Sequence, residues 1–326
     1  MIFLKYEKID RILEIFYRIV KGEQINLNKL AQNYGVSNKT ISRDINSIRT
    51  FLSENRTLMN NSELVYSYSS KTYTLQSDDL FLNKEMFAIV KVLLGSRCFN
   101  KDDLLTIIRK LKGFTTKDDR EMFNDIIKKE VYHYHPVKCD CHDVIDNLWK
   151  IILCINSQKV ITIKYYKMNR SEVLRKIKPV SIMFSEYYFY LIAYKYEDET
   201  FSPIYFRIDR IVSIVEHNEN FQLERKYDFN EGNLRKKNQF MFPGKDMKIK
   251  FEFKGLSVQA ILDRLPTATI VDKYDGKYLI EAEVNYGRGI IMYLLSQGSW
   301  VKVLSPQCLI DDITAELDKM KNLYQE

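Results

Sequence analysis

The most restrictive feature of this sequence is the segment GVSNKTISRDINSI at residues 35–48, together with the two apolar patterns that precede it. Gly35 follows a short helix predicted over 27–34 with Asn26 as its N-cap, and Ser37 caps a third helix predicted over 38–53. The first helix ends at Gly22 and carries apolar residues at helical spacing: Ile9, Ile12, Leu13, Phe16, Ile19 and Val20. Three helices with a short glycine-containing turn before the last are typical of a helix-turn-helix.

Helical geometry divides the third helix into a core face and an outer face. At about 100° per residue, a narrow arc holds Ile41, Ile45, Ile48 and Leu52. The opposite side holds Lys39, Arg43, Asn46 and Thr50. Arg and Lys can bond guanine, and Asn can pair with adenine, while small hydroxyl side chains can reach phosphates. We therefore predict a DNA-binding set made of Ser37, Asn38, Lys39, Thr40, Ser42, Arg43 and Asn46, with Lys71 from the segment that follows.

A β-hairpin is predicted after the third helix. Residues 64–68 and 71–75 are β-prone runs on either side of Ser69-Ser70, which fits the wing of a winged helix. Lys71 lies near the tip of this hairpin, where it could contact a backbone phosphate. A three-helix bundle with a hairpin could also serve as a protein-interaction module, and that alternative stays open at this point.

The turn and third helix resemble the DeoR-type winged domains, in which Val-Ser-x-x-Thr-Ile-x-Arg-Asp-Ile recurs. The matching residues are Val36, Ser37, Thr40, Ile41, Arg43, Asp44 and Ile45. The resemblance covers about fifty residues and implies that the helix over 38–53 enters the major groove of double-stranded DNA.

Composition fits an intracellular nucleic-acid-binding protein without requiring one. The net charge of +7 permits a polyanionic partner. No apolar run approaches the roughly 18–20 residues that cross a bilayer, so we expect no membrane association. Lys5 and Glu7 come too early for a secretory signal, and the five cysteines do not suggest a disulfide framework. We expect a cytoplasmic location.

The segment 79–142 is predicted to be a helical connector that ends in VYHYHPVKCDCH. Imidazole and thiolate groups are zinc ligands, which makes a metal site a hypothesis for His133, His135, Cys139, Cys141 and His142. The Cys-x-Cys-His spacing lacks the separations of structural zinc sites, and no second cysteine pair follows. We therefore favour a polar linker rich in His and Cys, and predict neither a metal nor a cofactor.

The segment 143–242 begins with a helix near 144–155 and continues with five predicted strands. Five short strands in about sixty residues fit a strongly bent sheet or a small barrel. Alternation in YYFYLIAY places Tyr188, Tyr190 and Ile192 on one face. Tyrosines beside arginines on a sheet can stack bases and pair phosphates, or they can be half-buried sheet residues.

This segment resembles a WYL domain. The matching residues are Tyr165, Pro179, Phe189-Tyr190-Leu191 and residues 206–211, FRIDRI. Phe189 stands where the family has its tryptophan. The resemblance implies an Sm-like β-barrel that senses a nucleic-acid or nucleotide-like effector, with contacts from Tyr165, Tyr190, Arg207 and Arg210. Arg175 and Lys178 are further candidates, chosen for charge alone.

The last segment, 243–326, shows the order β-α-β-β-α-β of ferredoxin-like folds, followed by a final helix. It resembles the extension that often follows WYL domains. We therefore predict an α+β multidomain chain: a winged helix-turn-helix over 1–78, a helical connector over 79–142, a WYL sensor over 143–242 and the extension over 243–326.

Two functions remain open from the sequence. The first is a ligand-responsive, DNA-binding transcriptional regulator that acts as a homodimer. The second is a nucleic-acid-processing or metal-dependent enzyme that uses the helix-turn-helix only for docking. Because the chain shows no Walker loop, Gly-x-Gly-x-x-Gly or Gly-x-Ser-x-Gly motif, we identify no catalytic residues and favour the regulator.

Overall fold

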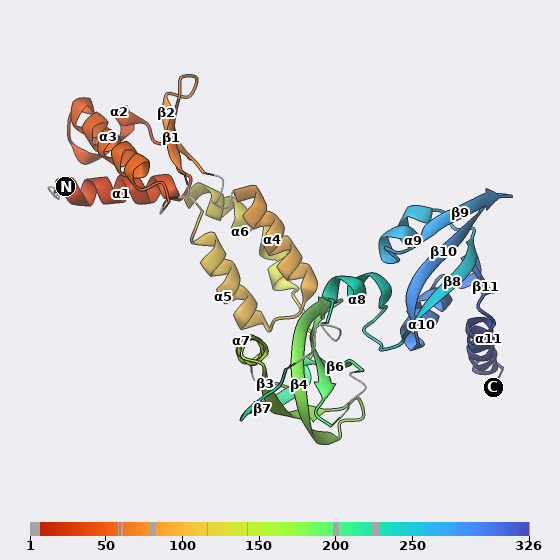
Figure 1. The fold of residues 1–326 in the computed structure, drawn as a ribbon. Coiled ribbons are helices and arrows are strands. Elements are labelled where there is room, and N and C mark those ends of the chain that lie inside the picture. The colour runs from red at the N-terminus through yellow and green to blue at the C-terminus, as the bar shows by residue number, and fades with distance from the viewer. Residues whose placement is uncertain are drawn as a thin grey trace. The chain divides into compact units, whose positions relative to one another are not determined.

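The computed structural model describes residues 7–57, 59, 61–77, 83–115, 117–141, 143–197, 202–222 and 229–325 of the 326-residue chain. The chain folds into two compact units, residues 1–137 and 138–326. In Figure 1 the first unit runs from red to yellow, and the second from green to blue. Among the described residues, no helix is long and apolar enough to cross a membrane.

The first unit begins with the predicted helix-turn-helix and wing. Its elements are α1 (Lys8–Val20), α2 (Leu27–Tyr34), α3 (Asn38–Glu54), β1 (Glu63–Ser67) and β2 (Thr72–Gln76). The Asn26 side chain accepts a hydrogen bond from the Lys29 amide, and Ser37 accepts one from the Thr40 amide. Gly35 ends α2 at φ 64°, a left-handed conformation that favours glycine. These local devices confirm the predicted helix starts and the turn.

The core of this domain is built largely from isoleucine and leucine. Its buried members are Ile15, Ile19, Ile25, Leu30, Ala31, Ile41, Ile45, Ile48, Leu52 and Leu64. The predicted core face of α3 is confirmed, but that of α1 is partly wrong, because Ile9 and Leu13 are 68% and 59% exposed. The buried row of α1 is instead Arg11, Ile15 and Ile19, four residues apart.

Between residues 83 and 132, the described residues of the first unit are mainly helical, as predicted. It contains α4 (Asn83–Ser96), α5 (Lys101–Lys112) and α6 (Lys117–Tyr132). Asn100 caps α5 by accepting a hydrogen bond from the Asp103 amide at 2.8 Å. The three helices bury apolar side chains that include Met86, Val90, Leu104 and Phe123.

The second unit begins with α7 (Val144–Asn156) and a five-stranded antiparallel sheet. The strands are β3 (Lys159–Tyr166), β4 (Glu172–Ser185), β5 (Tyr188–Lys195), β6 (Ile204–Arg207) and β7 (Ile211–Asn220), in the order β6-β5-β4-β3-β7. The five predicted strands are confirmed. The predicted Sm-like closure is not, because β6 and β7 lie at opposite edges and no pairing between described residues joins them. The short 3₁₀ turn η1 (Ile208–Arg210) carries the chain between these two edge strands.

The two faces of this sheet pack against different residues. Leu191 and Ala193 face the cluster that contains Ile151 and Cys154 of α7. Ile192 faces the other way and packs with Met183 and Met241, with Tyr190, Tyr205 and Leu234 of α8 (Glu231–Lys237) beside them. The alternation predicted along β5 is therefore observed.

The remainder of the second unit forms a four-stranded antiparallel sheet with helices. Its elements are β8 (Lys245–Phe253), α9 (Val258–Arg264), β9 (Thr269–Tyr274), β10 (Lys277–Tyr286), α10 (Arg288–Ser296), η3 (Gly298–Trp300), β11 (Val301–Ser305) and α11 (Gln307–Asn322). The strand order is β11-β8-β10-β9. The predicted element order β-α-β-β-α-β is observed, and α9, α10 and α11 each contribute residues to one core with the sheet.

Candidate functional site

The outer face of α3 carries the predicted base-reading side chains. Ile41 and Ile45 on the inner face are 0% and 1% exposed, whereas Lys39, Arg43 and Asn46 are all exposed. Neither Lys39 nor Arg43 forms an ion pair with a described residue. The two cationic groups therefore project from a helix whose opposite side is anchored in a core. That arrangement suits recognition of an anionic, hydrogen-bonding surface.

The small polar residues at the start of α3 have structural partners of their own. The Ser37 and Thr40 hydroxyl oxygens lie 2.9 Å apart, in addition to the capping bond from the Thr40 amide. Asn38 donates to the side-chain oxygen of Asn28 at 2.8 Å. Ser42 is half-buried. The structure thus brings Ser37, Asn38 and Thr40 together at the turn, next to the exposed residues of α3.

A buried ion pair that the sequence interpretation did not find holds α3 against α1. The Arg11 Nε donates to Asp44 Oδ2 at 2.6 Å, and the two side chains are 7% and 1% exposed. A charge removed from water needs a partner of opposite charge, so each residue depends on the other. The helical wheel held a signal, because Asp44 lies only about 60° from Ile41 and thus borders the core arc.

The wing is tied to the helices through its turn. Lys71 is exposed and adopts φ 54° between β1 and β2, and its carbonyl accepts a hydrogen bond from the Asn26 side chain at 3.0 Å. The backbone of Ile25 pairs with Tyr73 in an isolated antiparallel bridge. These contacts fix the hairpin relative to α2 and leave the Lys71 side chain in solvent.

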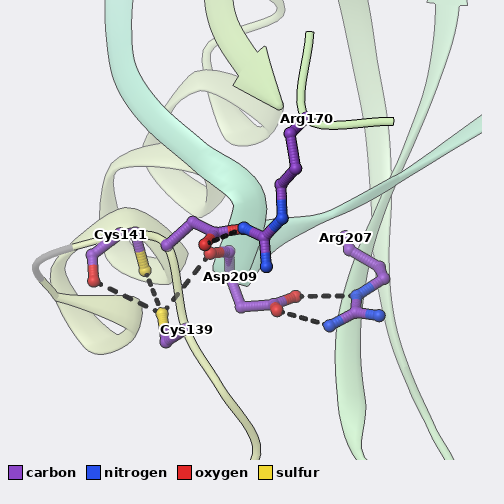
Figure 2. A network of polar contacts seen from close by, with 6 residues as sticks. Cys139, Cys141, Arg170, Arg207 and Asp209 are labelled. Atoms are coloured by element: carbon purple, nitrogen blue, oxygen red, sulfur yellow. Dashed lines mark hydrogen bonds and ion pairs between the residues drawn. The ribbon is translucent and has the colours of Figure 1, made fainter. Parts of the chain in front are cut away.

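On the central sheet, Arg207 is held in a defined orientation. Its Nε and one terminal nitrogen donate to the two carboxylate oxygens of Asp209 at 3.1 and 2.6 Å, as Figure 2 shows. The guanidinium also lies 3.3 Å from the centroid of the Tyr188 ring, a cation–π contact. An arginine has five N–H donors, and Asp209 accepts from two of them. Because the other donors have no hydrogen-bond partner among the described residues, they can serve a ligand.

The surroundings of this group keep the Arg207 guanidinium charged and the Tyr190 phenol neutral. Burial disfavours the charged guanidinium, but the hydrogen bonds and charge of Asp209 outweigh it and raise the pKa of Arg207. Burial raises the pKa of Tyr190 to about 12, against a smaller opposing effect of Arg207. Tyr190 therefore offers a neutral hydroxyl and an aromatic face beside a cation. Tyr188 was not among the predicted site residues, although it shares a face with Tyr190 in the β5 alternation.

The other predicted effector contacts are less concentrated. The Tyr165 ring packs edge-on against Phe206 at 5.1 Å, next to the α7 core, while Arg210 is half-buried in η1. Arg175 is exposed and donates to the Leu174 carbonyl. Lys178 lies 5.7 Å from the ring centroid of Tyr196. Arg207 therefore lies beside Tyr188 and Tyr190. Arg175 and Lys178 contact other residues instead.

The structure describes four of the five residues of the His/Cys cluster. Among the described residues, no group of three or more His, Cys, Asp or Glu side chains is placed to hold an ion. His133 and His135 belong to the first unit, Cys139 and Cys141 to the second, and His142 lies outside the described residues.

Comparisons with known proteins assign three domains. A DeoR-like helix-turn-helix domain matches residues 11–52, a WYL domain matches residues 146–216, and a WCX domain matches residues 245–321. No curated protein sequence matches the chain.

Two solved structures are similar to the chain at low sequence identity. The proteasome accessory factor B/C (PafBC) of Arthrobacter aurescens is 15% identical over 98% of this chain, with a TM-score of 0.28. The chain spans 49% of that protein, about half its length. A CRISPR Cas-related protein is 16% identical over 76% of this chain and 75% of its own, with a TM-score of 0.37.

The three matched domains coincide with three structural regions of the chain. The first contains the anchored α3 helix, the second contains the Arg207 group, and the third is the C-terminal α/β sheet. The chain therefore has the domain composition of a WYL-domain transcriptional regulator with an N-terminal DeoR-like helix-turn-helix.

Proposed function

We propose that this protein is a ligand-responsive transcriptional regulator that inserts α3 into the major groove of double-stranded DNA. The observation that carries the proposal is that α3 has one exposed polar side and one buried apolar side. Lys39, Arg43 and Asn46 are exposed, while the opposite face is buried among isoleucines. The match to a DeoR-like helix-turn-helix domain over the same residues supports this orientation. A protein with this role acts in the cytoplasm, on the genome.

Each exposed residue then has a chemical role. Arg43 reads a guanine with two parallel hydrogen bonds, and Asn46 pairs with an adenine. Lys39 contacts a guanine or a phosphate. The remaining proposed DNA contacts, to phosphates, come from Ser37, Asn38, Thr40, Ser42 and the wing residue Lys71.

Selection of genomic fragments by the purified full-length chain at moderate salt tests this function. We expect enrichment of a pseudo-palindromic site bound by a homodimer, with affinity roughly 10³–10⁷-fold above that for unrelated DNA.

The exposed apolar row Ile145, Trp149 and Ile152 on α7 offers surface for such a dimer. Absence of any preferred duplex, with and without cell extract as a source of effector, would contradict DNA recognition. A protected region covering one asymmetric half-site would contradict the dimer.

We also propose that the WYL domain binds a nucleic-acid or nucleotide-like effector at Arg207. The guanidinium would pair with a phosphate, and Tyr188 and Tyr190 would contact a base or sugar. Arg207 is pre-oriented by Asp209 and Tyr188, which lowers the entropy lost on binding. Tyr165 and Arg210 are further proposed effector contacts, because they match the WYL pattern. Arg175 and Lys178 are weaker candidates, because only their charge suggests them.

Replacing Arg207 by alanine tests the effector site. Against a panel of nucleoside phosphates and short single-stranded oligonucleotides, we expect Arg207→Ala to abolish binding that the unmodified chain shows. Operator affinity without effector should be unchanged, because α3 and Arg207 lie in different units. Titration calorimetry measures both quantities. Arg175→Ala is the matched comparison, since Arg175 is exposed and lies outside the Arg207 group. If only the Arg175 variant lost binding, the assignment to Arg207 would be wrong.

We further infer a ferredoxin-like fold for the C-terminal unit, because the strand order β11-β8-β10-β9 is antiparallel throughout and follows a β-α-β-β-α-β chain order. No observation favours the alternative of a nucleic-acid-processing or metal-dependent enzyme, and the three matched domains give it no support.

A further inference from the structure

Two cysteines of the second unit lie within reach of one another. The sulfur atoms of Cys139 and Cys141 are 2.8 Å apart, and Figure 2 shows them facing each other in the loop before α7. A disulfide needs a separation of about 2.05 Å, so closure requires a movement of under about 1 Å. Cys139 is exposed and Cys141 is half-exposed, which leaves the pair open to a small oxidant.

The pKa values of the two thiols are shifted in opposite directions by the hydrogen bond between them. A hydrogen bond from the Cys141 thiol lowers the pKa of Cys139, against the opposing effects of burial and of the Asp209 and Asp140 carboxylates. The same hydrogen bond, together with burial, raises the pKa of Cys141. An attacking thiolate beside a protonated thiol is the arrangement in which the first sulfur reacts and the second resolves the product.

The pair is anchored on the residue that orients Arg207. The Asp209 carbonyl accepts hydrogen bonds from the backbone amides of Asp140 and Cys141 at 2.9 and 3.0 Å. The Cys139 sulfur lies 3.4 Å from the same carbonyl oxygen. An ion pair between Arg170 and Asp140 further fixes the loop. The side chain of Asp209 meanwhile holds Arg207, so one residue links the sulfur pair to the Arg207 group.

We propose that Cys139 and Cys141 form a redox-modifiable dithiol that hydrogen peroxide converts to an intramolecular disulfide, and that this change reaches Arg207 through Asp209. This inference does not depend on DNA binding. The Cys139 thiolate attacks one peroxide oxygen, the O–O bond breaks, and hydroxide leaves, which gives a sulfenic acid on Cys139. The Cys141 sulfur then attacks the Cys139 sulfur. The S–O bond breaks, the S–S bond forms and water leaves with the Cys141 proton. Two thiols are oxidised by two electrons, and one peroxide is reduced to two waters.

Thiol counting on the full-length chain tests the modification. The reduced protein is treated with a small excess of hydrogen peroxide, denatured, labelled with a maleimide and mapped by mass spectrometry. We expect free thiols to fall from five to three, with both losses at Cys139 and Cys141 of the same chain and with full recovery after dithiothreitol. Survival of both thiols while Cys308 is oxidised would overturn the proposal, as would a disulfide between chains.

Cysteine variants give the matched controls. Cys308 is exposed and has no second cysteine beside it among the described residues, so Cys308→Ser should still lose two thiols. Cys139→Ser and Cys141→Ser should form no intramolecular disulfide, and Cys141→Ser should accumulate a sulfenic acid at Cys139 that dimedone traps. All three positions are exposed or half-exposed, so the variants should fold. Equal sulfenic acid formation at Cys308 and Cys139 would contradict the activation of Cys139 by its neighbour.

Hydrogen exchange tests the connection to Asp209. The amides of Asp140 and Cys141 donate hydrogen bonds to the Asp209 carbonyl, so we expect them to be protected from exchange in the reduced chain. We expect faster exchange at these amides and in residues 207–211 after oxidation, because closing the short Cys-x-Cys ring changes the loop backbone. Disulfide formation with unchanged exchange over 207–211 would refute the transmission to Arg207.

Discussion

Replacing Asp44 by alanine is expected to lower the free energy of unfolding of the winged helix by about 3–5 kcal/mol. The substitution leaves the guanidinium of Arg11 buried at 7% exposure without its carboxylate. It also opens space beside Ile41 and Ile45 on the same helix. Hydrogen exchange at the backbone amides of α1 and α3 in the full-length chain measures this loss separately from the other domains.

Two further variants separate the buried pair from a general charge effect. Asp10→Ala removes an exposed carboxylate from the first turn of α1, and should cost only about 0.3–1 kcal/mol through the helix dipole. The double variant Arg11→Met, Asp44→Leu should recover most of the lost stability, because a well-packed apolar pair can replace a buried ion pair. A loss under about 1 kcal/mol for Asp44→Ala would show that the pair does not hold α3 against α1.

Replacing Arg43 by alanine is expected to weaken binding to the preferred duplex by about 1–3 kcal/mol, or roughly 5- to 150-fold. The loss should be concentrated at one base pair of the site, because a bidentate contact to guanine discriminates against the other bases. Arg43 is exposed on α3 and forms no ion pair with a described residue, so the fold should be unaffected. Binding curves on the selected site and on each single-base variant of it measure the change.

Two variants distinguish base reading from simple charge attraction. Arg43→Lys keeps the charge but loses the planar fork, so it should retain affinity for unrelated DNA and lose much of the discrimination. Arg109→Ala removes an equivalent exposed charge from the last turn of α5 and should leave site preference intact. If Arg43→Ala weakened every duplex equally, Arg43 would be a phosphate contact instead.

The elements were predictable because their signals are local. Asn26 and Ser37 accept hydrogen bonds from amides three residues further along the chain, and Gly35 supplies a left-handed conformation at a single position. The alternation along β5 likewise depends only on successive residues, and it separated Tyr190 from Leu191 correctly. Capping residues and apolar periodicity together therefore identified the helix-turn-helix, and they showed which side of α3 is buried and which is exposed.

The local pattern was less informative where apolar residues cover more than one face of an element. On α1 the predicted apolar face included Ile9 and Leu13, which are exposed, and missed Ile15, which is buried. Whether the central sheet closes into a barrel was also not predictable from local patterns. Each strand was predictable, but whether the edge strands β6 and β7 pair depends on the path of η1 and not on either strand.

The helices, the strands and the exposed cationic face of α3 thus follow from the amino-acid order alone, since each depends on residues within a few positions of one another. The pairing of buried charges depends instead on how distant elements pack. Arg11 meets Asp44 across 33 positions, and the Cys139 loop meets Asp209 across 70. Such contacts arise because burial forces each polar group to find a partner, and that partner is whichever residue the packing of distant elements brings near.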